Sequence, residues 1–322
     1  MEQVSIGSSP LRIARIAFGG NIFGWTVDEK QSFTLIDAFL DRGFNCIDTA
    51  DYYSRFAEGL DGGESETVIG NWLAQGGGRR DRIVLCTKVG LEMGPGKQGL
   101  SAAYIAEAVD ACLRRLQTDH IDLLISHRDD PDTPIEETLG AYQKLIDAGK
   151  VRAIGASNFS AERLAESLKV SEQSGLPRYQ SLQPLYNLYD RFSYEGALQD
   201  VCVENKLSVF PYFALASGFL SGKYRTEADY EGQERAFLTR RYLDERGLRI
   251  LGAMDAVAAK HGVKLPPVAL AWLLTRPGVT APVASATSIA QLDTMAQAVS
   301  LKLDADDLAS LDRASQADPV AA

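Results

Sequence analysis

Short runs of apolar residues alternate along this chain with longer segments in which apolar residues recur every three or four positions. The short runs predict buried parallel strands, and the longer spacing predicts amphipathic helices. Glycine, proline and serine separate the two kinds of segment. The strands expected from this pattern are 15–18, 45–48, 83–87, 121–126, 151–156, 179–182, 207–210 and 279–283.

Each expected strand is followed by an expected helix. The first of these places Phe33, Ile36 and Leu40 on one face. Ser65, Ser101 and Ser160 stand where the next helices would begin, so they are expected N-caps. This alternation, with no composition break over residues 1–322, predicts a single closed (β/α)8 barrel in one domain. An open doubly wound sheet is the alternative, but no G-x-G-x-x-G follows the first strand.

Two segments stand outside the alternation. Residues 4–6 and 11–13 flank a Gly-Ser-Ser-Pro turn and predict an N-terminal β-hairpin. After the seventh barrel strand, residues 213–242 form a connection far longer than the ~4 to 6 residues that are usual. A connection of this length favours a functional lid over a plain link.

Composition and charge exclude several classes of partner. The net charge of −10 argues against nucleic acid and against an anionic membrane surface. It leaves room for an anionic cofactor, because a few local lysines or arginines suffice. The N-terminal segment does not resemble a signal peptide, and no apolar run reaches membrane-spanning length. The four cysteines are isolated and have no metal-ligand spacing, so we expect reduced thiols, no metal site and a cytoplasmic protein.

Ionisable side chains stand at the ends of three successive strands. Asp48 ends one strand and Tyr53 follows five residues later, Lys88 follows the next strand, and His127 follows the third. Because the carboxyl ends of parallel strands meet at one face of a barrel, these side chains are expected to share a site.

The four residue types suit proton transfer to a carbonyl group. Tyrosine has a pKa of about 10, and a neighbouring ammonium is expected to lower it. A carboxylate holds the ammonium in place, and a neutral histidine donates a hydrogen bond to the substrate oxygen. Hydride must then reach the carbonyl carbon, which requires a nicotinamide cofactor.

At this point the sequence resembles the aldo-keto reductase family over nearly its whole length. Asp48, Thr49, Ala50 and Tyr53 match the family's D-T-A-x-x-Y, and Lys88 and His127 match the rest of its tetrad. The Gly-Lys-Tyr at 222–224 is typical of bacterial and potassium-channel β-subunit-like members. The resemblance implies Tyr53 as general acid, Lys88 and Asp48 as its tuning pair, and His127 as the group that orients the carbonyl.

The resemblance also implies a nicotinamide nucleotide, with NADP expected and NAD open. The residues that it assigns to cofactor binding are Gly20, Asn21, Asp48, Ser157, Asn158, Gln183, Tyr212, Leu215, Gly218, Lys223, Arg225, Ser285, Thr287 and Gln291. Among these, Tyr212 is expected to stack on the nicotinamide. Gln291 stands where many members carry an arginine, and Met295 where asparagine is common, which is why NAD stays open.

The expected activity is reduction of an aldehyde or ketone to an alcohol, or the reverse reaction. Trp25, Phe56 and Arg128 are candidate substrate-pocket residues because of their loop positions. The expected partner is therefore a small carbonyl or alcohol. Two alternatives remain: a cofactor-holding regulatory subunit with little turnover, and an aldolase that forms a Schiff base on Lys88.

Overall fold

Eight parallel strands form one sheet in which neighbours follow the order of the sequence, and the last strand pairs with the first. The protein is described by a computed structural model over residues 1–232 and 236–317. Every strand of this sheet is short and almost entirely buried. The strands are β3 (Ala17–Gly19), β4 (Cys46–Asp48), β5 (Val84–Val89), β6 (Ile121–Ser126), β7 (Val151–Ser157), β8 (Tyr179–Gln183), β9 (Ser208–Val209) and β10 (Val283–Ala284).

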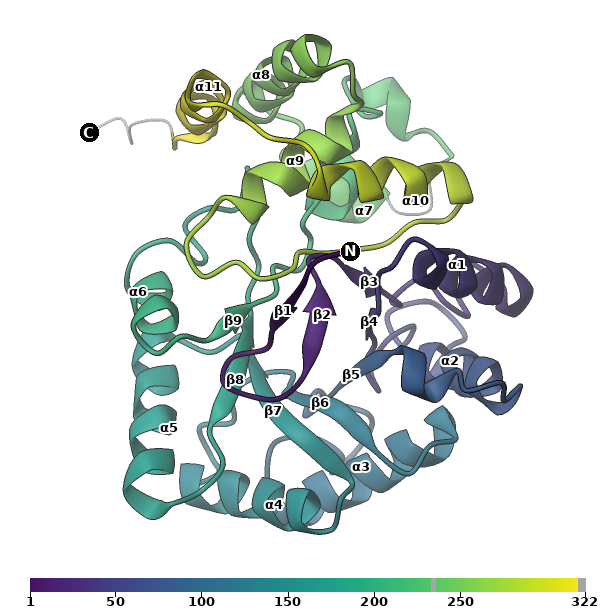
Figure 1. Cartoon of the computed structure of the whole chain (residues 1–322), viewed down its shortest axis with the longest axis vertical. Helices are drawn as coiled ribbons and strands as arrows, with labels where there is room; N and C mark the ends of the chain where they lie inside the picture. Colours follow the sequence, from purple (N-terminus) through teal and green to yellow (C-terminus); the bar gives the residue numbers. More distant parts are fainter. Residues whose placement is uncertain (233–235, 318–322) are drawn as a thin grey trace.

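Backbone hydrogen bonds join the two ends of this sheet. The Val209 N–H donates to the Gly278 carbonyl at 3.1 Å, and the Thr280 N–H donates to the Val209 carbonyl at 2.9 Å. The Val283 N–H donates to the Pro211 carbonyl at 2.9 Å. These bonds close the sheet, and Figure 1 shows helices around it, so the predicted (β/α)8 barrel is confirmed.

The last strand lies further along the chain than predicted. Residues 279–283 were expected, whereas β10 is Val283–Ala284. Val279 forms only an isolated bridge with Val209. Pro282 has no N–H to donate, so a regular ladder cannot run through it, and regular pairing with β3 begins at Val283.

Helices cover the outside of the barrel. Ser101 and Ser160 cap their helices as predicted, each hydroxyl accepting the N–H three residues on. The prediction for Ser65 was wrong, because Gly63 is the N-cap and the buried Ser65 hydroxyl donates to the Gly20 carbonyl instead. The helices are α1 (Glu29–Asp41), α2 (Glu64–Ala74), α3 (Ala102–Leu116), α4 (Ile135–Asp147), α5 (Ala161–Ser174), α6 (Ala197–Glu204), α7 (Ala236–Thr239), α8 (Glu245–His261), α9 (Leu265–Leu274), α10 (Ile289–Ala296) and α11 (Ala305–Ser315).

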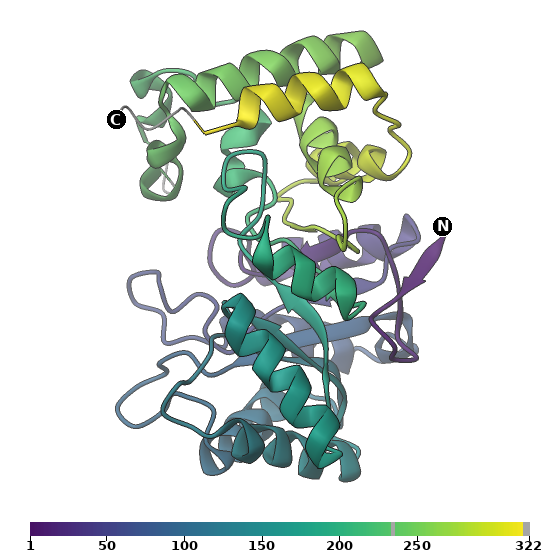
Figure 2. The ribbon, with the colours of Figure 1, turned by 90° about the vertical axis from the view of Figure 1, so that its left-hand side faces the viewer.

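The predicted N-terminal hairpin is present and closes one end of the barrel. Strands β1 (Gln3–Ser5) and β2 (Arg12–Ala14) pair antiparallel, and Ile6, Leu11 and Ile13 are buried against the barrel interior. That interior is filled by residues of several strands and of the segment before β10: Ala17, Cys46, Val84, Cys86, Leu123, Ile125, Ala153, Phe210, Ala281 and Val283. Figure 2 shows the N-terminal hairpin on one side of the barrel and long loops on the other.

The long connection between β9 and α8 is also present. It contains the short helices η2 (Ala216–Ser221), η3 (Glu227–Tyr230), α7 and η4 (Arg240–Tyr242). Residues 233–235 of the predicted lid lie outside the described residues. Beyond it, α8 lies beside α11 in Figures 1 and 2. Within the described ranges, no helix has both the length and the apolar character that crossing a bilayer requires.

Candidate active site

Three hydrogen bonds hold the Lys88 ammonium near the carboxyl end of β5. Its Nζ donates to Asp48 Oδ2, to the Thr49 carbonyl and to the Tyr53 hydroxyl, each at 2.8 Å. Lys88 is 0% exposed and Asp48 is 2% exposed. A buried ammonium stays charged only where a carboxylate and further acceptors replace its lost hydration. The ends of β4 and β5 therefore form a preorganised ion pair.

The Asp48 carboxylate connects three strands of the barrel. Besides the bond from Lys88, it accepts the Tyr53 hydroxyl at 3.1 Å and Gln183 Nε2, from the end of β8, at 2.9 Å. The sequence placed Gln183 at the cofactor, and the residue does line the cavity described below, but its amide nitrogen also fixes the carboxylate. Both oxygens of Asp48 are thus held.

The Tyr53 phenol is protonated throughout the neutral range. Burial raises its pKa well above 10, and the charge and hydrogen bond of Asp48 raise it further. The expected lowering of this pKa beside Lys88 is therefore not seen, because burial and the Asp48 carboxylate raise it. The hydroxyl therefore has a proton that it could donate to a ligand in the cavity.

His127 is held as a neutral imidazole. Burial lowers its pKa well below 6.5, and the positive charges of Lys88 and Arg128 lower it further. Its ring lies edge-on to Tyr53, with ring centroids 6.1 Å apart. Its Nδ1 is buried and has no hydrogen-bond partner within the described part of the chain. A neutral imidazole carries one N–H, so His127 can donate one hydrogen bond to a substrate oxygen.

A cavity of about 1020 Å³ opens beside these groups and is lined by both Tyr53 and His127. That volume exceeds a drug-sized ligand site and is large enough for a dinucleotide with a small substrate. Most of the residues that the sequence assigned to cofactor or substrate line it: Asn21, Trp25, Phe56, Ser157, Asn158, Gln183, Tyr212, Leu215, Gly218, Lys223, Ser285, Thr287 and Gln291.

Four other assigned residues do not line this cavity. One is Asp48, whose carboxylate is held by Lys88, Tyr53 and Gln183 as described above. The Arg225 guanidinium donates two hydrogen bonds of 2.7 and 2.8 Å to the Asp255 carboxylate. Its Nε donates to the Gly222 carbonyl, so Arg225 stabilises the turn before Lys223. Gly20 packs under the site, where a Cβ would lie 3.0 Å from Ser65 Oγ and 3.1 Å from the Asp48 carbonyl. Arg128 is exposed beside His127.

A hydrogen-bonded chain runs from His127 to Tyr212 along the cavity wall. Asn158, in the left-handed conformation with φ 57°, donates its amide to the His127 carbonyl at 2.9 Å. The Tyr212 hydroxyl donates to Asn158 Oδ1 at 2.8 Å. Ser157 Oγ donates to the Gln183 carbonyl at 2.8 Å. These contacts fix the polar groups that the resemblance assigned to the nicotinamide end.

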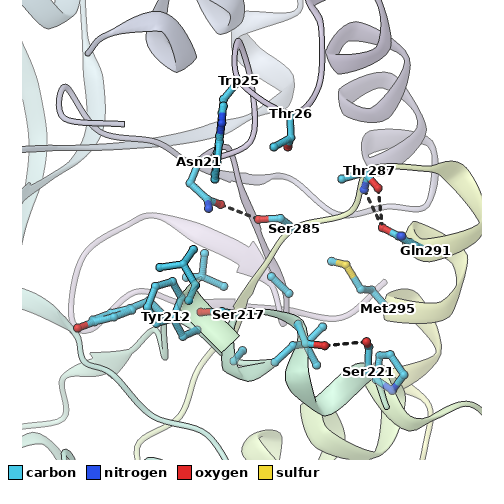
Figure 3. Close-up of a pocket in the computed structure, with 18 of the residues that line it drawn as sticks. Asn21, Trp25, Thr26, Tyr212, Ser217, Ser221, Ser285, Thr287, Gln291 and Met295 are labelled. Atoms are coloured by element: carbon cyan, nitrogen blue, oxygen red, sulfur yellow. Dashed lines mark hydrogen bonds between the residues drawn. The ribbon is translucent and has the colours of Figure 1, made fainter. Parts of the chain in front are cut away.

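The opposite end of the cavity is built from the segment after β10 and from η2. Figure 3 shows Tyr212 at one end of this view and Ser221, Thr287 and Gln291 at the other. The Thr287 N–H and hydroxyl donate to Gln291 Oε1 at 2.8 and 3.1 Å. Met295 lies between Gln291 and Ser221 in Figure 3.

The start of η2 has an unusual backbone. Ala216, Ser217 and Gly218 have φ values of 48°, 56° and 105° in succession. Left-handed conformations are costly for residues other than glycine, and they cluster at ligand sites. The buried Ser217 hydroxyl has no hydrogen-bond partner among residues 1–232 and 236–317. It is therefore a donor available to a ligand in the cavity.

The charged side chains that line the described cavity are basic, although the chain as a whole is acidic. The chain has 43 aspartates and glutamates against 33 lysines and arginines. Within the described residues, the lining contains Lys223 and Lys264 and no carboxylate. Such a surface suits an anionic ligand. Thus the residues present fit a nicotinamide dinucleotide.

Sequence reasoning missed two features near the site. Asp51, whose backbone N–H donates to the Lys88 carbonyl at 3.1 Å, is buried, and burial, followed by the charge of Glu66, raises its pKa well above 3.8. Glu66 itself accepts the Thr87 hydroxyl at 2.5 Å and Arg115 Nε at 2.7 Å. The other feature is Lys264, which precedes α9 and carried no signal because it follows no strand.

The parallel barrel, and the cavity that opens beside Tyr53, Lys88, Asp48 and His127, are consistent with an enzyme of the oxidoreductase class. The Aldo/keto reductase family model matches residues 15–316, and the chain belongs to that family. It is 34% identical to the aldo-keto reductase YhdN of Bacillus subtilis, over 95% of this chain and 91% of that protein.

Two further relatives carry an oxidoreductase name and a channel-subunit name. The uncharacterized oxidoreductase YrpG of Bacillus subtilis is 34% identical, over 94% of this chain and 93% of its own. A probable voltage-gated potassium channel subunit beta of Arabidopsis thaliana is 30% identical, over 93% of this chain and 91% of its own. The family and the relatives named as oxidoreductases support an oxidoreductase function for this chain.

Proposed function

We propose that this protein reduces an aldehyde or ketone to the alcohol, or catalyses the reverse reaction, with NADPH as the preferred nucleotide. The observation that carries this proposal is the group formed by half-buried Tyr53 and buried Lys88 and Asp48, joined by bonds of 2.8 to 3.1 Å. Tyr53 forms part of the wall of the cavity of about 1020 Å³, whose described lining contains two lysines and no carboxylate.

In this mechanism Tyr53 and His127 act on the carbonyl oxygen. The neutral imidazole donates its N–H to that oxygen, and the phenol gives up its proton. Lys88 stabilises the phenolate that remains, since its Nζ is 2.8 Å from the hydroxyl oxygen. Asp48 keeps the ammonium charged and in position. The nicotinamide nucleotide, when bound, supplies the hydride.

The lining supports binding of a nicotinamide dinucleotide. Ser157 and Asn158 present polar groups at the Tyr212 end, where the tyrosine ring is available for stacking. The left-handed turn at 216–218 and Lys223 suit the diphosphate. In dinucleotide-binding Rossmann folds that prefer NAD, a carboxylate commonly holds the adenosine ribose diol. The described lining has none, which favours NADP.

The residues around the mouth favour an apolar carbonyl substrate. Trp25 and Phe56 form an edge-to-face pair with ring centroids 4.9 Å apart, and Tyr52 and Leu91 line the same cavity. Aromatic pairs of this kind bury flat apolar groups well. Arg128 does not line the cavity and offers no counter-charge there, so we propose uncharged aromatic or aliphatic aldehydes and ketones as substrates.

The geometry of Lys88 argues against an aldolase. A Schiff-base lysine must be neutral and reach the substrate carbon. The three donor positions of Lys88 are all used, it is paired with Asp48, and it is 0% exposed. A cofactor-holding subunit remains the second candidate, because one relative carries the name of a channel subunit.

A nucleotide titration followed by a turnover assay tests the proposal. Trp25 lines the cavity whereas Trp72 and Trp272 are 0% exposed, so tryptophan quenching on binding reports mainly on Trp25. We expect saturable quenching with NADPH, and NADPH oxidation when aromatic or aliphatic aldehydes are added. Binding without turnover across a carbonyl panel would favour the cofactor-holding subunit. The absence of any nucleotide binding would overturn both functions.

A further inference from the structure

We propose that Ser65 and Glu66, in the first turn of α2, are positioning residues that set the geometry of the proton-donating group from outside the barrel. The proposal deepens the function proposed above and rests on it. Both residues are 0% exposed, and neither lines the described cavity. They act through two threonines, each next in the chain to one member of the buried ion pair.

The two threonines lie at the ends of neighbouring strands. Thr49 follows Asp48, the last residue of β4, and Thr87 precedes Lys88 in β5. Successive side chains of a strand point to opposite faces, so the threonines point away from the barrel interior when the ion pair points into it. Both threonines are buried, and their hydroxyls therefore need partners within the protein.

Ser65 is the partner of the first threonine. Its Oγ lies 2.8 Å from Thr49 Oγ1 and donates its one proton to the Gly20 carbonyl at 2.7 Å, so the Thr49 hydroxyl is the donor between them. The Gly20 N–H in turn donates to the Asp48 carbonyl at 2.7 Å. Ser65 therefore joins the segments after β3 and β4, and the carbonyl of Thr49 is one of the acceptors of the Lys88 ammonium.

Glu66 is the partner of the second threonine. Its Oε1 accepts the Thr87 hydroxyl at 2.5 Å, and its Oε2 accepts Arg115 Nε, from α3, at 2.7 Å. A glutamate at the third position of a helix commonly binds the N–H of the N-cap residue. The N-cap here is Gly63, without such a capping box, and both oxygens of Glu66 bind β5 and α3 instead. The first turn of α2, which Figure 1 shows outside the barrel, thus holds the end of β5.

The same bonds bear on the segment that carries Tyr53. The Thr49 N–H donates to the Cys86 carbonyl at 2.8 Å. The Asp51 N–H donates to the Lys88 carbonyl at 3.1 Å, so this segment continues the pairing of β4 with β5. A shift of β5 against β4 would therefore change the distance of 2.8 Å between Lys88 Nζ and the Tyr53 hydroxyl. A displacement of about 1 Å at a catalytic group can cost about a hundredfold in rate.

Two substitutions remove these links without touching the cavity. Thr87→Val removes a hydroxyl and keeps the shape of the side chain, and Ser65→Ala removes the other link. In single-turnover oxidation of bound NADPH by benzaldehyde, we expect each variant to be about tenfold slower, with less than about twofold change in the NADPH dissociation constant and in the aldehyde concentration that gives half the maximal rate. Thr87→Ser keeps the hydroxyl and should restore the rate.

Asp122→Asn is the matched control. Asp122 is also a buried carboxylate that holds β5, because it accepts the Leu85 N–H at 2.8 Å. It pairs with Arg80 and Arg152 at the start of β6, towards the other end of the strands. Asp122→Asn should lower stability in urea unfolding and leave the single-turnover rate within about twofold of the wild type.

Amide hydrogen exchange of the full chain supplies a readout that needs no turnover. In Thr87→Val and Ser65→Ala, residues 49–53 should exchange faster than in the wild type, because the bonds that hold this segment on β5 open more often. The remote helix α5 should exchange as in the wild type. Ser65→Ala keeps the experiment decisive if Thr87→Val does not fold.

Wild-type rates in both variants, or unchanged exchange of residues 49–53, would overturn the positioning role. Failure of Thr87→Ser to restore the rate would do the same, as would an equal loss of rate in Asp122→Asn, since either result indicates general destabilisation. A wild type that binds NADPH and reduces no carbonyl would remove the reductase function. The exchange of residues 49–53 would then decide the positioning role by itself.

Discussion

Replacing Lys88 with methionine tests both the buried ion pair and the proposed chemistry. Methionine keeps a similar length and removes the charge and three hydrogen bonds of 2.8 Å. Asp48 would remain 2% exposed, with only the bonds from Tyr53 at 3.1 Å and Gln183 at 2.9 Å to replace the ammonium. The variant therefore leaves a buried carboxylate without its counter-charge.

Breaking a buried ion pair by removing one partner costs about 3 to 5 kcal/mol of unfolding free energy. Because two hydrogen bonds to Asp48 remain, we expect a loss of about 3 kcal/mol. Lys88→Met/Asp48→Asn has no unpaired charge, and its unfolding free energy should return to within about 1 kcal/mol of the wild type. Both variants should lose about 10²- to 10⁴-fold in kcat for carbonyl reduction, since neither has the group that stabilises the tyrosine phenolate.

The assay is urea unfolding at neutral pH, followed by tryptophan fluorescence, with Lys302→Met as the surface control. A Lys88→Met variant within about 1 kcal/mol of the wild type would refute the argument that this ammonium compensates a buried carboxylate. Recovery of turnover in the double variant would refute the role of Lys88 in the chemistry, even if the stability changes were as expected.

Two pH-dependent predictions follow from the pKa shifts. Tyr53 keeps its proton until the pH rises through its raised pKa, and His127 stays neutral until the pH falls through its lowered pKa. We therefore expect kcat/KM for reduction to be constant between about pH 7 and 9. A tenfold change in kcat/KM per pH unit in this range would contradict the roles assigned to the two residues. Because the folded pKa of Asp51 is raised above its unfolded value near 3.8, its stabilising contribution is fully present below that value and is lost as the pH rises through the folded pKa. Asp51→Asn should therefore gain stability relative to the wild type as the pH rises from about 5 to 8 in urea unfolding, and a constant difference would count against a buried titrating carboxyl.

The sequence predicted the barrel and the spatial grouping of Asp48, Tyr53, Lys88 and His127, because both depend on strand ends. Asp48, Lys88 and His127 each close or follow an apolar run, so a barrel brings them together whatever their detailed packing. The hairpin was predictable for a similar reason, since its turn residues separate two short apolar runs. Pro282 displaced the last strand, an effect that an apolar pattern alone does not contain.

The features that the sequence did not predict depend on burial and on contacts between distant segments of the chain. The pKa of Tyr53 was expected to fall beside Lys88, but the depth of burial decides its direction, and depth is a property of the folded barrel. Gln183 was assigned to the cofactor, and its bond to Asp48 joins residues 135 positions apart. Lys264 lies beyond any strand end, so only the walls of the cavity reveal it.

The central claim is that the Tyr53 phenol, held by Lys88 and Asp48, gives its proton to a carbonyl oxygen in the cavity. The most direct test is single-turnover oxidation of bound NADPH by an aromatic aldehyde, comparing the wild type with Tyr53→Phe. The account predicts a rate about 10²- to 10⁴-fold lower in the variant, with the NADPH dissociation constant unchanged. Equal rates in the two proteins would contradict it.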